Sequence, residues 1–447
     1  MHSALILGIF LGAMSWMSPA PASKSAPEEF IVPLQATTSR STLRNSGRVR
    51  LVKKDELTGK PAFQAKNAQT AIIAAINQKT SGCWMIRYGT DFGWVAASNI
   101  HYSASDNPVT LRRSQQEARF KAFTDARTQL AGCLRALSPE ARRAVAKRLE
   151  QDSSIQLALI NLATNDAEKW EQALRILARG FVAYSVEEDT AKHSHSIQVN
   201  LVTTLKTATQ LTRPAANAIE ATSIQEGLAQ LLAEIQAGLI PPVGNRLIVV
   251  NASGELTLVG YAINLIGVHP NAAAQDKLRV DAEKIATARA TEAIIGLAIG
   301  DDTRWQHNLD EISQREVRTA ASGYDDNEPS ANRFRQIRDL VMASAKDDPG
   351  LQTLVEGNLP SSAAIKRFGE EDRVAVAVIY TPTVRKPAPP PPPPATPVVE
   401  PANDSPVMPS VTEPSPGSSP PPPVPPAAES STTIPPVIES SEPTETR

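Results

Sequence analysis

One arrangement of a helix, a hairpin and a second helix occurs twice in this chain and restricts its fold more than any other feature. In the clearer copy, between Glu226 and Leu297, an apolar helical segment ends at Gly238. The turn residues Pro241-Pro242-Val243-Gly244 then lead into a strand, and Ala252-Ser253-Gly254 turns the chain back into a second strand. A long alanine-rich helix follows, whose small residues suit close packing on a sheet. This order predicts an α+β unit.

A weaker copy of the same order lies between Gln69 and Leu134. Its first helix places Ile72, Ile73 and Ile76 on one face, and its long helix has apolar residues at spacings of three and four. Both long helices contain an Ala-Arg pair, Ala126-Arg127 and Ala288-Arg289. The sequence predicts two related α+β halves, each a small antiparallel sheet packed by a long alanine-rich helix and shorter helices. The alternative is one continuous α+β domain in which the repeated order of helices and strands is a coincidence.

Other segments complete the halves. Residues 181–188 and 196–205 read as strands joined by the charged linker EDTAKHSH, and Arg373–Tyr380 reads as a central strand because both of its faces are apolar. A helix is expected to start at Pro139, and further helices are expected at 166–178, 304–320 and 331–345. The predicted organisation is a signal peptide (1–22), an extended lead-in (23–66) with one short strand at 48–53, a first half (67–212), a second half (213–384) and a disordered proline-rich tail (385–447).

The N-terminal segment predicts export, and the C-terminal segment predicts a disordered tail. Residues 4–14 form an apolar run too short to span a bilayer, and Ala20-Pro21-Ala22 has the small-x-small form of a cleavage site, so cleavage is expected after Ala22. No later apolar run is long enough for a transmembrane helix. The tail from Arg385 is dominated by proline, which favours polyproline II and cannot continue a helix or a sheet. A plain flexible tail and a spacer or docking segment both fit that composition.

The charge distribution argues against nucleic acid as a partner. The tail from Pro387 has seven acids and one base, a net charge of −6, whereas the whole chain is at −2 and the remainder is therefore at +4. So small an excess over more than three hundred residues gives no strong positive field.

Two cysteines, Cys83 and Cys133, fit an exported chain. In an oxidising compartment they are candidates for one disulfide, and two buried free thiols are the alternative. No histidine near either cysteine indicates an activated thiol.

No familiar catalytic or cofactor motif occurs, so we predict no catalytic, cofactor-binding or metal-ligating residue. Three weaker groups remain. His193 and His195, following Glu187-Glu188-Asp189, are metal-ligand types that a solvated linker would also contain. The acidic segment Asp325–Glu328 has oxygen ligands but lacks the pattern of an EF-hand. Trp94, His101 and Tyr102 could line a pocket, although aromatic residues at strand spacing more often belong to a core.

The run GLIPPVGNRLIVVNASGELTLVGYAINLI and the following AEKIATARATEAIIG resemble a domain of unknown function from exported bacterial proteins. That domain is similar to the small bacterial surface-lipoprotein family, in which a helix of the form A-x-x-x-A-R-x-x-L/I packs on a few strands. The resemblance covers residues 219–381 and, more weakly, 69–205. It implies secretion and an α+β fold, and it transfers no catalytic residue. This chain lacks the N-terminal cysteine on which lipoproteins are anchored.

These observations predict an exported protein of the bacterial cell envelope with a non-catalytic binding, assembly or scaffolding role. The expected partner is an envelope protein or a cell-wall component, with the proline-rich tail as one route of contact. A secreted hydrolase with a site assembled from distant residues, and a metal-binding module, are the alternatives.

Overall fold

The computed structural model describes residues 35–36, 48–150, 166–191, 194–250, 253–301, 303–307, 309, 311–322 and 329–384. Within them the predicted α+β class is confirmed, since helices pack on two separate sheets. The predicted signal peptide and the proline-rich tail lie outside the described residues. His193 and the acidic segment 325–328 lie outside them too.

The first sheet has the strand order β1-β6-β7-β5-β4-β3-β2. Its strands are β1 (Gln35–Ala36), β2 (Arg50–Val52), β3 (Ala62–Ala65), β4 (Gly82–Tyr88), β5 (Asp91–Tyr102), β6 (Phe181–Ala191) and β7 (Ser194–Thr204). The helices of this half are α1 (Ala68–Ile76), α2 (Pro108–Arg135), α3 (Pro139–Glu150), α4 (Asp166–Arg179) and α5 (Leu205–Gln210).

The second sheet has the order β12-β13-β11-β10-β9-β8. Its strands are β8 (Leu211–Ala215), β9 (Ala218–Ala221), β10 (Val243–Val250), β11 (Leu256–Leu265), β12 (Ala364–Gly369) and β13 (Arg373–Tyr380). The helices are α6 (Ile224–Gln236), α7 (Ala272–Ile299), α8 (Thr303–Gln306), α9 (Glu311–Ser322), α10 (Pro329–Ser344) and α11 (Pro349–Val355).

Apart from the short β1, the two sheets have the same topology. The order β2-β3-β4-β5-β7-β6 in the first half matches β8-β9-β10-β11-β13-β12 in the second. The pairing directions match as well. Only β3 with β4, and β9 with β10, are parallel among these neighbours. Both sheets are therefore mixed: the expected antiparallel pairs are present, and each sheet has in addition one parallel pair that involves a strand, β3 or β9, that was not predicted.

A constant difference in residue number relates equivalent positions of the two halves, from the second strand of the hairpin into the long helix. Trp94, which pairs with Met85, is equivalent to Leu258, which pairs with Leu247, and 258 minus 94 is 164. The same offset joins the helix caps, since 271 minus 107 is also 164. The Asn107 and Asn271 side chains accept from backbone N–H groups of two helices of 28 residues each.

The buried alanines of the two long helices keep this offset. Ala118, Ala122 and Ala126 of α2 correspond to Ala282, Ala286 and Ala290 of α7, and all six are buried. The Ala-Arg pairs at 126 and 288 differ by 162, so the structure does not place them at equivalent positions. That expected correspondence is corrected.

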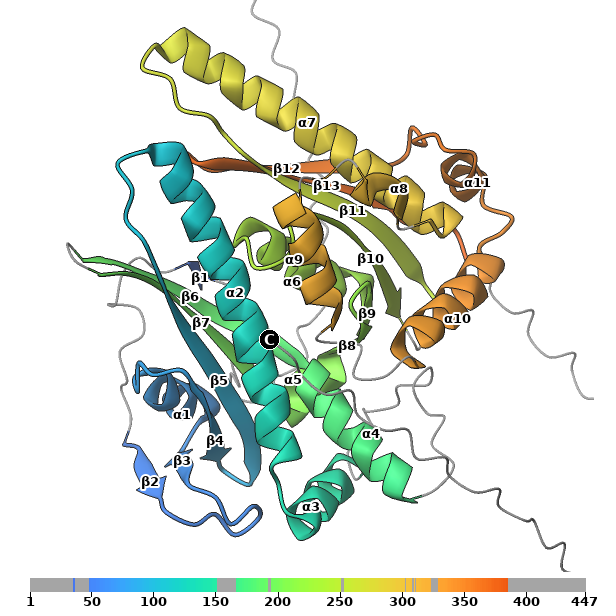
Figure 1. Ribbon diagram of the computed structural model, residues 1–447. Coiled ribbons are helices and arrows are strands. Elements are labelled where there is room, and N and C mark those ends of the chain that lie inside the picture. The colour runs from blue at the N-terminus through green and yellow to red at the C-terminus, as the bar shows by residue number, and fades with distance from the viewer. Residues whose placement is uncertain are drawn as a thin grey trace, which may run out of the picture. The chain divides into compact units, whose positions relative to one another are not determined.

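The helices divide between the faces of the sheets. In the first half, α1 packs on one face with Ile86 and Val95, while α2 packs on the other with Met85 and Trp94. In the second half α7 covers the face of Leu258, and α6 covers the face of Val259. The residues of α2, α6 and both sheets between them form one continuous apolar core, so the two halves share a core through α2 (Figure 1).

Close approach of α7 to the second sheet depends on Gly260 of β11. A Cβ at Gly260 would lie 2.1 Å from the carbonyl oxygen of Ala290 and 2.5 Å from the amide nitrogen of Ile294. Because both are backbone atoms of α7, they cannot rotate away as a side chain could. The glycine therefore sets how closely α7 lies on the sheet.

Two sequence expectations for other elements change. The predicted lead-in supplies β2 and β3, so its residues 50–65 belong to the first sheet. The predicted charged linker is mostly strand, because β6 runs to Ala191 and β7 starts at Ser194. The central position of β13 is confirmed, since it pairs with both β11 and β12.

Among the helices in the described ranges, none has the length and apolar character needed to cross a membrane.

Candidate functional site at the junction of the two halves

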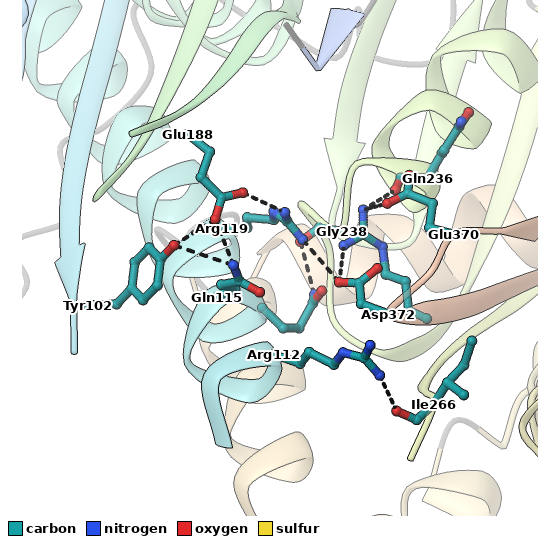
Figure 2. Close-up of polar contacts among 12 residues, drawn as sticks. Tyr102, Arg112, Gln115, Arg119, Glu188, Gln236, Gly238, Ile266, Glu370 and Asp372 are labelled. Carbon is teal, nitrogen blue, oxygen red and sulfur yellow. Dashed lines mark hydrogen bonds and ion pairs between the residues drawn. The ribbon is translucent and has the colours of Figure 1, made fainter. Parts of the chain in front are cut away.

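Helix α2 carries a row of polar side chains toward the second half. Arg112 donates through Nη1 to the carbonyl oxygen of Ile266 at 2.7 Å, and Gln116 donates through Nε2 to that of Gly238 at 3.0 Å. With Arg119, these residues recur at spacings of four and three and so lie along one face of the helix. Figure 2 shows these contacts leaving α2 toward loops and strand ends of the second half.

Glu188 of β6 accepts hydrogen bonds from Arg119 and Gln115 of α2 and from Tyr102 of β5 (Figure 2). Its Oε1 accepts from the Tyr102 hydroxyl at 2.6 Å and from Gln115 Nε2 at 2.8 Å. Its Oε2 accepts from Arg119 Nη2 at 2.9 Å. Three donors from β5 and α2 thus hold one carboxylate, which ties the long helix to the sheet beneath it.

Arg119 extends this network across the junction. Its Nη1 lies 3.9 Å from Asp372 Oδ2, and Asp372 in turn accepts from Arg373 Nη1 at 3.2 Å. Arg373 also contacts Glu370 at 2.7 Å and donates to the carbonyl oxygen of Gln236 at 3.0 Å. Burial lowers the pKa of Arg373, and repulsion from Arg119 lowers it further, while Asp372 and Glu370 oppose the change. Along this network negative and positive side chains alternate, and the attraction between neighbours offsets the free-energy cost of burying the charges.

The hydrogen bonds around Glu188 keep Tyr102 as a donor and Glu188 as an acceptor. Burial, followed by the hydrogen bond to Glu188, raises the pKa of Tyr102 to about 12. The phenol therefore stays protonated at neutral pH and acts as a donor. Both oxygens of Glu188 are already engaged by donors. The arrangement positions the two halves and offers neither of these groups as a free base.

A second buried contact joins the halves at β8. Arg213 donates through Nη1 to the carbonyl oxygen of Phe181 at 2.7 Å and pairs through Nη2 with Glu234 of α6. Its guanidinium lies 4.1 Å from the centre of the Phe181 ring. Arg213 and Glu234 are 4% and 2% exposed, so neither charge is solvated and each requires the other.

A cavity of about 210 Å³ lies beside the polar row. Its walls come from the first turns of α2, from Pro242, from the end of β11, from α7 and from α9. Two elements far apart in sequence, α2 and α9, are therefore brought to one hollow. A hollow of this kind can receive a small ligand.

The structure separates the three aromatic residues singled out in the sequence. Trp94 is buried in the shared core, where its ring packs edge-on against Phe92. Tyr102 belongs to the Glu188 network, and His101 is exposed on the opposite face of β5. They do not line a common pocket, so that hypothesis was wrong.

The hypothesis that His193 and His195 belong to a metal site in a linker does not fit the position of His195, because the strands extend into the predicted linker. His195 lies in β7, opposite Thr190 and Tyr102, and its ring packs edge-on against the Tyr102 ring at 5.3 Å. Glu188, one of the acids proposed with it, is taken up by Arg119 and Tyr102. In the part of the chain that the structure describes, no group of three or more His, Cys, Asp or Glu side chains is arranged to hold a metal ion.

The two cysteines are brought together. Cys83 of β4 and Cys133 of α2 form a disulfide with their Cα atoms 6.1 Å apart. The bond fastens the C-terminal part of α2 to the first sheet. It lies in the same helix as the junction row, about four turns further on.

Sequence reasoning missed the junction between the halves, and it named Glu188 only as a candidate metal ligand. Arg112, Gln116, Arg119, Glu188 and Asp372 are ordinary charged or polar residues scattered over 260 positions. One signal was present: Gln115, Gln116 and Arg119 stand at positions that a helix places near its apolar face. Polar residues there indicate a contact with another part of the chain, but do not identify it.

Comparisons with known proteins add little to this site. No protein-family model and no curated protein matches the chain. Among solved structures, the chain is similar to a hypothetical protein from Francisella tularensis, with 12% identity, 65% of this chain and 83% of that chain covered, and a TM-score of 0.22. A likeness at that TM-score carries no argument about the function of this chain.

Proposed function

We propose that this chain is an exported protein of the bacterial cell envelope with a non-catalytic binding, assembly or scaffolding role. The observation that carries the proposal is the joining of two halves of like topology into one core by α2 and by buried charge pairs. Such a junction holds two sheets in a fixed relation, which suits a protein that presents surfaces to a partner.

The disulfide supports export. Disulfides form and persist in oxidising compartments, and are rare where cellular thiols are kept reduced. The bond between Cys83 and Cys133 lies between two central elements of the first half. It agrees with the apolar N-terminal run and the cleavage pattern at Ala22 in the sequence.

A pull-down from envelope extract tests the role. The mature chain and a version ending at Arg385 are immobilised separately, and the retained proteins and cell-wall material are compared. The same partner retained by both versions places the binding surface on the folded halves, and a partner retained only with the tail places it there. If neither version retains a specific partner, the proposed role is rejected.

A further inference from the structure

Another cavity, of about 240 Å³, lies within the first half, where α4 packs against α2 and α3 (Figure 1). We refer to it as the α2–α4 cavity. Its wall on α4 consists of Glu171, Leu174, Arg175 and Ala178, which recur at spacings of three and four and therefore share one face of the helix. The last turns of α2 form the opposite wall, and Arg142 of α3 closes one side.

The inner part of the α2–α4 cavity is apolar. Leu134 of α2 and Leu174 of α4 are buried. Ala131 and Ala178, one on each helix, are half-buried beside them, and their short side chains leave room for another group. A ligand that fills this part of the cavity gains free energy by bringing a small aliphatic group.

The charged side chains that line the cavity are three guanidiniums and one carboxylate. The carboxylate is already paired, because Arg142 Nη1 lies 3.0 Å from Glu171 Oε1. Arg142 also donates through Nε to the carbonyl oxygen of Leu137 at 3.1 Å and through Nη2 to that of Arg135. Arg142 and Glu171 therefore form a neutral pair that is fixed to the backbone between α2 and α3.

Arg135 and Arg175 supply the remaining positive charge of the lining, one from each wall. Both side chains are exposed, and among the described residues neither guanidinium has an ion pair or a hydrogen bond. Three guanidiniums less one carboxylate leave the lining at +2. A phosphate monoester carries a charge of about −2 and three terminal oxygens, so one such group can pair with both guanidiniums, whereas a carboxylate brings a single charge.

The wall on α2 is fastened before any ligand binds. Cys133, next to Leu134 in the sequence, is bonded to Cys83 of β4 and holds this end of the helix on the first sheet. The bonds from Arg142 to the carbonyl oxygens of Leu137 and Arg135 hold α3 against the same end. Binding in a cavity with fixed walls costs less conformational entropy than binding that must first order them.

We infer that the α2–α4 cavity binds a small phosphate monoester of an aliphatic alcohol. Arg135 and Arg175 pair with the phosphate group, and the aliphatic group packs against Leu134, Leu174 and the alanines beside them. The site belongs to the first half alone and is independent of the proposed assembly role. A chain that has lost this binding still retains its partner in the pull-down.

Isothermal titration calorimetry on the mature chain tests the site with four probes, at about pH 8, where a phosphate monoester carries close to two negative charges. n-Butyl phosphate has both the head group and the aliphatic group. Inorganic phosphate lacks the aliphatic group, 1-butanol lacks the charge, and pentanoate has one negative charge in place of two. We expect n-butyl phosphate to bind, and each of the other three to bind at least about fivefold more weakly, because each forgoes apolar burial or a charged contact.

Matched variants assign the contacts. Arg135→Gln and Arg175→Gln should each weaken the binding of n-butyl phosphate at least about fivefold. Lys147→Gln removes one positive charge from an exposed position of α3 outside the lining, and it should leave the affinity unchanged. The proposed site is refuted if n-butyl phosphate gives no binding heat at millimolar concentration. Inorganic phosphate or pentanoate binding as tightly as n-butyl phosphate, or equal effects of the lysine and arginine variants, would also overturn it.

Discussion

Arg119 of α2 and Asp372 of the segment before β13 face each other across the junction, with Arg119 Nη1 3.9 Å from Asp372 Oδ2. The same guanidinium binds Glu188 of its own half at 2.9 Å. One side chain therefore links two carboxylates from different halves. Their exposed fractions, between 13% and 20%, place the three groups in the partly buried range, where an ion pair contributes more than on an open surface.

Replacing Arg119 by methionine should destabilise the protein by about 2 kcal/mol, because two partly buried carboxylates lose their shared cation. Urea unfolding followed by circular dichroism measures the change. Arg315→Met is the control, since Arg315 belongs to an exposed pair within α9 and its loss should cost under about 0.5 kcal/mol. Equal effects of the two variants would contradict the role assigned to Arg119.

Two glycines should respond in opposite directions to the same substitution. Gly260→Ala should lower stability by about 2 kcal/mol, since its Cβ would meet the backbone of α7 at 2.1 Å. Gly132→Ala, inside α2 with nothing within 4 Å of the added Cβ, should raise it by about 0.5–1 kcal/mol through helix propensity. Thermal unfolding of both variants checks this. A Gly260→Ala protein as stable as the parent would show that α7 does not lie so close to β11.

Asp348 should make stability depend on acid pH. Burial raises the pKa of Asp348, but hydrogen bonds from Tyr380 and from the N–H groups of Thr383, Leu351 and Gly350 outweigh it, so the pKa is lowered. A lowered carboxyl pKa contributes stability above the unfolded value of about 3.9, and that contribution is lost as the pH falls through the folded value.

Asp348→Asn should therefore cost about 1–2 kcal/mol at neutral pH, where the parent carboxylate caps α11. The difference between parent and variant should shrink below about pH 4. Urea titrations at several pH values measure it, with Glu356→Gln at the exposed end of the same helix as the control. A difference that is constant with pH would rule out an ionised Asp348 as its source.

Removing the disulfide should have a large effect on stability. The two cysteines are 50 residues apart, and closing a loop of that length contributes about 4 kcal/mol in the chain-entropy model. The Cys83→Ser, Cys133→Ser double variant should lose about that much in urea unfolding. Parent protein reduced with dithiothreitol should match the variant. A parent whose stability is unchanged by reduction would contradict a structural disulfide in the folded protein.

The sequence predicted the elements with a strong local pattern and missed those without one. The helices at Pro108–Arg135 and Ala272–Ile299 were predicted from their spacing and from the turn residues before them. Strands β8 and β9, which include Pro214 and are only five and four residues long, lack the alternation that marks a strand. Their place in the second sheet depends on the pairing of β9 with β10 and of β8 with β9, which no local pattern encodes.

The junction illustrates the same limit. Arg119 and Glu188 look like solvated charges in the sequence, because nothing near them in the chain shows that β6 and α2 meet. The cavity needs α2, β11, α7 and α9 together, and no one of these segments carries a recognisable motif. Sites of this kind arise from tertiary packing and become visible only with the fold.

Export is the claim on which the proposed role depends, and one measurement tests it directly. Cells producing the chain are separated into cytosolic and envelope fractions, and the protein from each is digested without reduction and analysed by mass spectrometry. The account predicts protein in the envelope fraction, with an N-terminus following Ala22 and a peptide pair joined through Cys83 and Cys133. Full-length protein confined to the cytosol with both thiols free would contradict it.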